Sequence, residues 1–169
     1  MKVLISYLRL GDNMKKVLFI SSGGGHFNEL MRLEPLFKKY DSYFATEKLK
    51  ATLDLKEKFK GKFFYLVYGT KDHMLTYPFK LLANCFISLY QIIKIRPDVV
   101  ITTGAQSAGP MCCLAKLFRK KVIYIETMAN ITKKTITGRL VYHFADLFIV
   151  QWESMLKLYP KAVYKGLIY

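Results

Sequence analysis

Short apolar runs alternate with longer amphipathic segments along this chain. The first run, 17–20, is apolar on both faces, as expected of a buried parallel strand. Strands that alternate with helices at this spacing predict βαβ units and a Rossmann-like α/β fold, a parallel sheet with helices on both faces. We expect strands at 16–21, 42–46, 63–67, 98–102, 121–126 and 147–151, and helices at 27–39, 49–59, 77–95, 111–118 and 137–144.

Three loops that are rich in glycine or polar residues each follow a strand, at 21–26, 103–110 and 126–134. The carboxyl ends of parallel strands meet at one edge of a sheet, and ligands of such folds bind there. We therefore expect the three loops to lie together and to form one site.

The first of these loops holds three successive glycines followed by His26. Glycine allows a tight turn and a close approach of the backbone to a ligand. The helix expected behind it presents free N–H groups and a partial positive charge, which suit a phosphate. His26 would then stand at the mouth of an anion site, where an imidazole is useful for proton transfer. A purely structural role in capping the helix is the alternative.

The length of 169 residues fits one domain, and a hydrophobic fraction of 52% excludes a disordered chain. Met14 precedes two lysines and a strand, which is typical of a natural start. Residues 14–169 are therefore interpreted as the domain, and residues 1–13 as an extension to which no function is assigned. The apolar stretch at the beginning is too short for a signal peptide.

The formal net charge of +15 suggests an anionic partner: nucleic acid, an acidic membrane or a phosphorylated substrate. Lysines are densest over 48–62, where interleaved acids fit a solvated helix face equally well. We expect no nucleic-acid partner, because zinc-ligand spacing, an RNA-recognition motif and a convincing helix-turn-helix are all missing. Cys85, Cys112 and Cys113 show no metal-ligand spacing, so free thiols and no metal or cofactor are expected.

The predicted helix 77–95 has thirteen uncharged residues between Lys80 and Lys94. They would span roughly 20 Å, short of the ~30 Å hydrocarbon core of a bilayer. The helix is apolar nearly all round, so one stripe must cover the sheet and another must meet a partner chain or a membrane surface. Full burial in a tight domain is the alternative. The stripe expected to contact a membrane consists of Phe79, Leu82, Phe86, Leu89 and Ile93.

Two nucleotide-binding motifs fit the first loop poorly. A dinucleotide fingerprint requires Gly-x-Gly-x-x-Gly; Gly23 and Gly25 match, but Asn28 occupies the third position. Glu47 would serve as the acid that binds a ribose. A P-loop is excluded, because no Gly-Lys-Ser/Thr follows the glycines. An oxidoreductase with a degenerate loop remains an alternative function.

Taken in order, the segments 22–26, 102–105, 109–110 and 123–129 resemble the glycine loops and the acidic strand end of two-domain GT-B glycosyltransferases that act on lipid-diphosphate acceptors. The peptidoglycan N-acetylglucosaminyltransferase is the familiar member. More similar still are half-length proteins: the membrane-associated subunit of the two-chain enzyme that adds the second N-acetylglucosamine to dolichol diphosphate, and its bacterial capsule and exopolysaccharide counterparts. The segment 140–169 resembles the bacterial members, described as enhancers of a β-1,4-galactosyltransferase.

The resemblance implies that the chain equals the N-terminal, acceptor-binding half of a GT-B enzyme. It implies a separate partner chain that binds a UDP-sugar and contacts residues 152–169, and little transfer of a hexose by this chain alone. The implied acceptor is a sugar linked to polyprenyl diphosphate. The implied location is peripheral, on an anionic membrane surface at the cytoplasmic face of the cell membrane, in capsule or exopolysaccharide synthesis.

The resemblance also implies roles for single residues. His26 is the expected general base for the acceptor hydroxyl. Glu126 is an alternative base or a group that orients His26, unless it merely caps the next turn. A scaffold that only anchors and activates its partner is the competing function. The residues expected to bind the acceptor diphosphate are Ser22, Gly23, Gly24 and Gly25 on one side, and Gly104, Ala105, Gln106 and Ser107 on the other.

Overall fold

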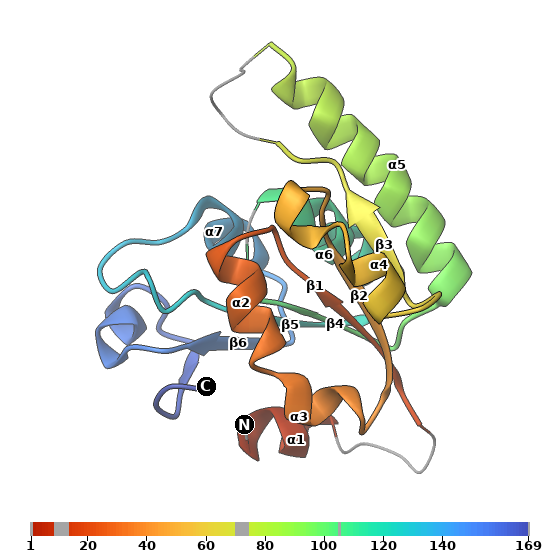
Figure 1. The fold of residues 1–169 in the computed structure, drawn as a ribbon. Coiled ribbons are helices and arrows are strands. Elements are labelled where there is room, and N and C mark those ends of the chain that lie inside the picture. Colours follow the sequence, from red (N-terminus) through yellow and green to blue (C-terminus); the bar gives the residue numbers. More distant parts are fainter. Residues whose placement is uncertain (1, 9–13, 70–74, 105, 169) are drawn as a thin grey trace.

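The computed structural model describes residues 2–8, 14–69, 75–104 and 106–168. They form a sheet of strand order β3-β2-β1-β4-β5-β6-β7, in which every neighbouring pair is parallel. The predicted Rossmann-like parallel sheet is thus confirmed (Figure 1). The strands are β1 Lys16–Ile20, β2 Asp41–Glu47, β3 Phe63–Leu66, β4 Val99–Thr102, β5 Lys121–Ile125, β6 Leu147–Val150 and β7 Val163–Tyr164.

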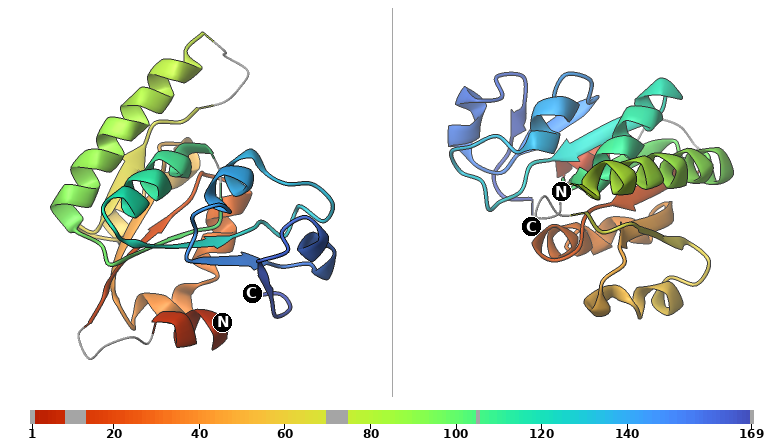
Figure 2. Two further views of the ribbon diagram at one scale, coloured as in Figure 1. Left: turned by 180° about the vertical axis from the view of Figure 1, so that it is seen from behind. Right: turned by 90° about the horizontal axis from the view of Figure 1, so that it is seen from above.

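Helices cover both faces of the sheet (Figure 2). Successive residues of a strand point to opposite sides, so each strand places apolar side chains on both faces. In β1, Val17 and Phe19 join one buried cluster, whereas Leu18 and Ile20 join the other. The first cluster packs under α1 Lys2–Leu8, α2 Gly25–Met31, α3 Glu34–Phe37 and α4 Leu55–Lys58. The second packs under α5 Tyr77–Ile95, α6 Gly109–Leu117 and α7 Ile136–Val141.

Two predicted helices are broken in the structure. The segment 27–39 divides into α2 and α3, because Pro35 has no N–H group and is accommodated only in the first turn of a helix. The segment 49–59 divides into a 3-10 turn, Lys50–Thr52, and α4. There the hydroxyl of Thr52 donates to the carbonyl of Glu47 and accepts from the N–H of Leu49, which ties the backbone into a turn.

The described part of the amino-terminal extension packs on the domain. Leu4 and Leu8 of α1 are fully buried in the first core cluster. The hydroxyl of Tyr7 donates to the carbonyl of Asp146 at 3.1 Å, and Lys15 Nζ donates to the carbonyl of Leu8 at 2.8 Å. Residues 2–8 therefore contribute to the core.

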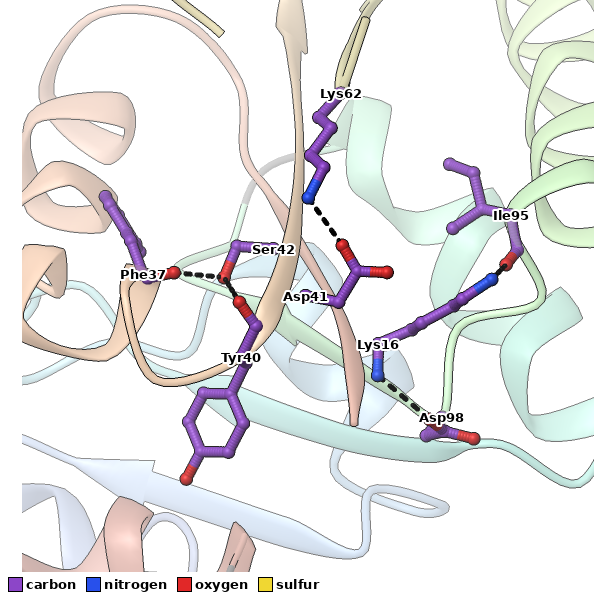
Figure 3. A network of polar contacts seen from close by, with 8 residues as sticks. All are labelled: Lys16, Phe37, Tyr40, Asp41, Ser42, Lys62, Ile95 and Asp98. Carbon is purple, nitrogen blue, oxygen red and sulfur yellow. Dashed lines mark hydrogen bonds and ion pairs between the residues drawn. The ribbon is translucent and has the colours of Figure 1, made fainter. Parts of the chain in front are cut away.

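The amino-terminal edge of the sheet is held by short polar contacts (Figure 3). The backbone N–H of Lys16 donates to Asp98 Oδ2 at 2.9 Å, and its Nζ reaches the carbonyl of Ile95. Lys62 Nζ pairs with Asp41 at 2.6 Å. These contacts hold the amino-terminal ends of β1, β2 and β4 in place.

The opposite edge contains the point at which the chain reverses its direction across the sheet. β2 and β3 lie on one side of β1, and β4 to β7 lie on the other. The connections that follow β1 and β4 therefore run to opposite sides of the sheet, and the crevice at the carboxyl ends of such neighbouring strands is the usual ligand position in this fold.

Candidate functional site

Two reciprocal hydrogen bonds join the loops after β1 and β4. His26 Nδ1 lies 2.9 Å from the carbonyl oxygen of Thr103, and Thr103 Oγ1 donates to the carbonyl of His26 at 2.7 Å. Because a carbonyl only accepts, Nδ1 carries the proton of this bond. In the neutral ring, Nε2 then holds the lone pair, which is the arrangement that a general base requires.

A cleft of about 480 Å³ lies at this edge, and His26 forms part of its wall. All three predicted loops contribute to it, the third through Lys134, so their expected convergence is confirmed. The lining residues are Ser22, Gly23, His26, Glu47, Tyr68, Gly69, Gln106, Lys134, Thr135, Ile136 and Thr137.

The glycine loop turns through Gly24, whose φ of 71° lies in the left-handed region. Gly24 and Gly25 are exposed at the start of α2. The N–H of Gly23, in contrast, donates to Glu47 Oε2 at 3.1 Å. The N–H of Gly23 therefore already has a partner within the protein. An amide that binds the acceptor diphosphate must instead be free to donate to that ligand.

Of the described residues in the second loop, Gln106 lines the cleft. Gly104 is buried with a φ of 103°, and a Cβ there would lie 2.9 Å from the Tyr124 hydroxyl. Ser107 is buried near Glu47, and Ala105 lies outside the described residues. Of the three described residues expected on this side, Gln106 is the one that lines the cleft.

Glu47 is a lining residue that the sequence analysis considered only for a dinucleotide. It ends β2 and is 4% exposed. Burial raises its pKa, and the hydrogen bond from Gly23, the nearby polar groups of Ser107 and Gly69, and the charge of His26 partly oppose that effect. Its position at the end of a strand on the same edge is the signal that predicted the three loops, and it applied equally to Glu47.

Glu126 lies under the site and does not line the cleft. It is 1% exposed and accepts from Thr135 Oγ1 at 3.1 Å, from the Tyr159 hydroxyl at 2.9 Å and from the N–H of Thr127 at 3.2 Å. Burial raises its pKa, against the effect of these hydrogen bonds.

The contacts of Glu126 match the structural alternative considered for it. Thr135, which it holds, also accepts from the N–H of Gly138 and so caps α7. Within the described residues, the ring of His26 is oriented by the carbonyl of Thr103 rather than by this carboxylate. A direct part for Glu126 in proton transfer remains a prediction.

Helix α5 has polar as well as apolar residues on its buried face and a row of apolar residues on its exposed face. Its inner face buries Asn84 and Ser88, and the amide of Asn84 both accepts from and donates to the backbone of Val67. The alternative of a fully buried helix is wrong, since the outer stripe is open and Phe79 is 75% exposed. Figure 1 shows α5 on the outside of the fold. The exposed stripe consists of Phe79, Leu82, Phe86, Leu89 and Ile93.

Over residues 2–8, 14–69, 75–104 and 106–168, none of the helices has both the length and the apolar character to cross a bilayer. The same residues hold no group of three or more histidine, cysteine, aspartate or glutamate side chains arranged to bind a metal. The three cysteines are free thiols.

Two solved structures share this fold over most of the chain. The MurG protein of Acinetobacter baumannii matches with a TM-score of 0.65 and 19% identity, over 80% of this chain and 41% of that one. UDP-N-acetylglucosamine 2-epimerase of Rickettsia bellii matches with a TM-score of 0.67 and 14% identity, over 91% and 45%. This chain spans less than half the length of either, and the likeness confirms the predicted fold of a GT-B half.

Two curated relatives match over most of their length. A human protein named UDP-N-acetylglucosamine transferase subunit ALG14 is 26% identical over 90% of this chain and 82% of its own. The subunit of the same name in Yarrowia lipolytica is 24% identical over 90% and 81%. The profile of the family described as "Oligosaccharide biosynthesis protein Alg14 like" matches residues 17–168. The chain belongs to this Alg14-like family of oligosaccharide biosynthesis proteins.

Proposed function

We propose that this chain is the acceptor-binding subunit of a two-chain glycosyltransferase whose other subunit binds a UDP-sugar. The observation that carries the proposal is the cleft lined by Ser22, Gly23 and His26, in which Nε2 of His26 is available. The exposed residues Gly24 and Gly25 lie between Gly23 and His26 in the same loop. The names of the relatives favour N-acetylglucosamine as the sugar on the partner's nucleotide.

The acceptor diphosphate binds at the glycine loop. Gly24 and Gly25 supply backbone N–H groups at the amino end of α2, where an anion is favoured. Gly23 acts differently, since its N–H holds Glu47 and thereby shapes the loop. Lys134 on the facing wall provides a positive charge, and Gln106 closes the cleft.

Sugar transfer requires a base for the acceptor hydroxyl. Nε2 of His26 takes the hydroxyl proton while the oxygen attacks the anomeric carbon, and the UDP leaves with the electron pair of its bond to the sugar. A positioned base contributes about 10²–10⁴ in rate. The carbonyl of Thr103 and the nearby charges of Glu47 and Glu126 stabilise the imidazolium that forms.

The subunit binds a membrane surface peripherally, at the cytoplasmic face, through the exposed stripe of α5 together with surrounding lysines. Each basic residue near an anionic surface contributes ~1 kcal/mol. The partner docks at residues 152–169, where β7 is the last strand of the sheet and Leu167 is exposed. In a bacterium, the product belongs to a capsule or an exopolysaccharide.

Reconstitution with the partner subunit tests this function. The chain and a co-expressed UDP-sugar-binding partner are mixed with a polyprenyl-diphosphate-linked sugar, and transfer is followed with a radiolabelled donor. We expect transfer by the pair and little by either chain alone. His26→Ala should lower turnover by about 10²–10⁴ while the pair stays assembled on size-exclusion chromatography.

Two other outcomes identify the competing functions. Unchanged turnover of the His26→Ala pair would assign this chain to a scaffold role, with all catalytic groups on the partner. Saturable binding of NAD or NADP in a titration would revive the oxidoreductase; we expect none, because Glu47, the acid assigned to the ribose, already binds the N–H of Gly23.

A further inference from the structure

A second cavity of about 530 Å³, here termed the apolar groove, lies between α5, α6 and the first turn of α7. Its walls are almost entirely hydrocarbon and thiol, and among the described residues no lysine, arginine, aspartate or glutamate lines it. The residues that form its walls include Leu81, Leu82, Phe86 and Leu89 of α5, Pro110, Cys113 and Leu114 of α6, and Ile136 and Leu140 of α7.

The apolar groove adjoins the His26 cleft. Gln106, Ile136 and Thr137 line both cavities, so the two meet at these residues. At its other side the groove includes Leu82 and Phe86, which belong to the exposed stripe of α5. The groove thus lies between the surface proposed to meet the membrane and the cleft proposed to hold a diphosphate.

An occupant of both cavities must be apolar along one part and anionic at one end. A peptide helix meets the first requirement, because its backbone is hydrogen-bonded internally, but an apolar helix carries no anionic group for the His26 cleft. A free nucleotide meets only the second. A branched hydrocarbon with a terminal diphosphate meets both, since its chain needs no hydrogen bonds and gains by leaving water.

We propose that the apolar groove binds the first isoprene units of a polyprenyl diphosphate, with the diphosphate end in the His26 cleft. The inference rests on the proposed function, because it takes the acceptor to be such a lipid. It adds that the chain recognises the lipid tail itself, and not only the membrane in which the tail lies.

Cys113 provides a reporter for this inference, because it is exposed and lines the groove. Cys85, the other thiol on the wall, is removed by Cys85→Ala. Cys112 is fully buried and burial raises its pKa far above the usual range, so it stays unreactive. The rate of maleimide labelling then reports on the accessibility of Cys113.

The experiment measures this labelling rate with geranylgeranyl diphosphate below its micelle concentration and without any membrane. We expect labelling to slow by about tenfold at roughly ten times the dissociation constant, as mass action requires for a covered thiol. Inorganic pyrophosphate should leave the rate unchanged, because it fills only the cleft. Geranylgeraniol should protect at higher concentrations only, because it lacks the anionic end.

A matched pair of leucine variants locates the effect. Leu140 is 51% exposed and lines the groove, whereas Leu117 is 75% exposed and lies outside it. Both tolerate a polar replacement without loss of the core. Leu140→Gln should raise the concentration of prenyl diphosphate that gives half-protection by about tenfold, and Leu117→Gln should leave it unchanged.

The outcomes separate this inference from the function on which it rests. If the labelling rate is unchanged and the pair transfers sugar, the inference about the groove is overturned and the proposed function stands. If the lipid protects Cys113 and the pair transfers no sugar, the inference stands and the proposed function is overturned. Protection by the partner subunit alone, without lipid, would assign the groove to a contact between proteins and overturn the inference.

Discussion

The acidic residues at the amino-terminal ends of the strands and those at the carboxyl ends lie in opposite environments. At the amino-terminal edge, Asp41, Asp98 and Asp146 precede or begin strands and accept from lysine side chains or backbone N–H groups while remaining in contact with water. At the carboxyl edge, Glu47 and Glu126 are buried, and burial raises the pKa of both.

The difference separates residues that secure the fold from residues that prepare a site. Contacts of exposed charges cost little and contribute little, typically below ~1 kcal/mol. Burying a carboxylate opposes folding unless donors surround it, and such groups gather at functional sites. The carboxyl edge therefore holds the larger interaction energies, and substitutions on the two edges should differ accordingly.

The largest effect is expected for Gly138→Ala. A Cβ at this position would lie 2.5 Å from Thr135 Oγ1 and 2.6 Å from the Tyr159 hydroxyl, and it would also crowd Glu126. Forcing a methyl group into this network should lower the free energy of unfolding by about 3 kcal/mol in a urea titration. Gly109→Ala is the control, because its Cβ would meet nothing within 4 Å and a helical alanine is favourable. Equal stability of the two variants would contradict the comparison.

The next largest effect is expected for Thr135→Val. The nearly isosteric change removes the cap on the N–H of Gly138 and both contacts with Glu126. The free energy of unfolding should fall by about 2 kcal/mol, because the helix cap is lost and the buried carboxylate of Glu126 loses hydrogen-bond donors. Thermal melting monitored by circular dichroism measures it. A variant as stable as the parent would show that Glu126 does not depend on this hydroxyl.

The pH dependence of stability should follow the buried glutamates. A carboxyl group whose pKa is raised in the folded state binds its proton more tightly when folded, so its contribution is complete at low pH and is lost as pH rises from about 4.5 through the raised folded value. Glu47→Gln should flatten this decline, by at most ~1.4 kcal/mol per pH unit. Unfolding titrations from pH 4 to pH 8 measure the slope. An unaltered slope would show that Glu47 keeps the same affinity for protons in both states.

The smallest effects belong to the amino-terminal edge. Lys62→Ala and Lys116→Ala break the pairs with Asp41 and Asp146, whose members are all partly exposed. Each should change the free energy of unfolding by less than ~1 kcal/mol, and less still at high salt. If either lysine substitution lowered the free energy of unfolding as much as Thr135→Val, it would contradict the proposed contrast between the two ends of the strands.

The fold was predictable because its signal is local. Each strand shows as a short apolar run bounded by polar residues. The order of the strands, in which β1 pairs with β2 and β4, does not follow from that alternation and is known from the structure. The helix breaks were harder to predict, since the periodicity of 27–39 continues across Pro35 and says nothing of where the backbone turns. The 3-10 turn at Lys50–Thr52 depends on the hydroxyl contacts of Thr52, which no hydrophobic pattern encodes.

The site was predictable where chain order alone places residues together. His26, Gln106 and Lys134 follow β1, β4 and β5, so their common edge follows from a parallel sheet. The contacts of each side chain could not be predicted from chain order. They depend on packing between segments far apart in sequence, as in the hydrogen bond from Gly23 to Glu47. The same holds for the contacts of Glu126 with Thr135 and Tyr159.

The packing of α1 makes the first helix part of the folded unit. Removing residues 2–8 would take away Leu4 and Leu8, whose side chains belong to the first core cluster. It would also remove the hydrogen bond from the Tyr7 hydroxyl to the carbonyl of Asp146, just before β6. A deletion of this helix should therefore make the protein easier to digest with a protease, because the hydrocarbon under it would meet water.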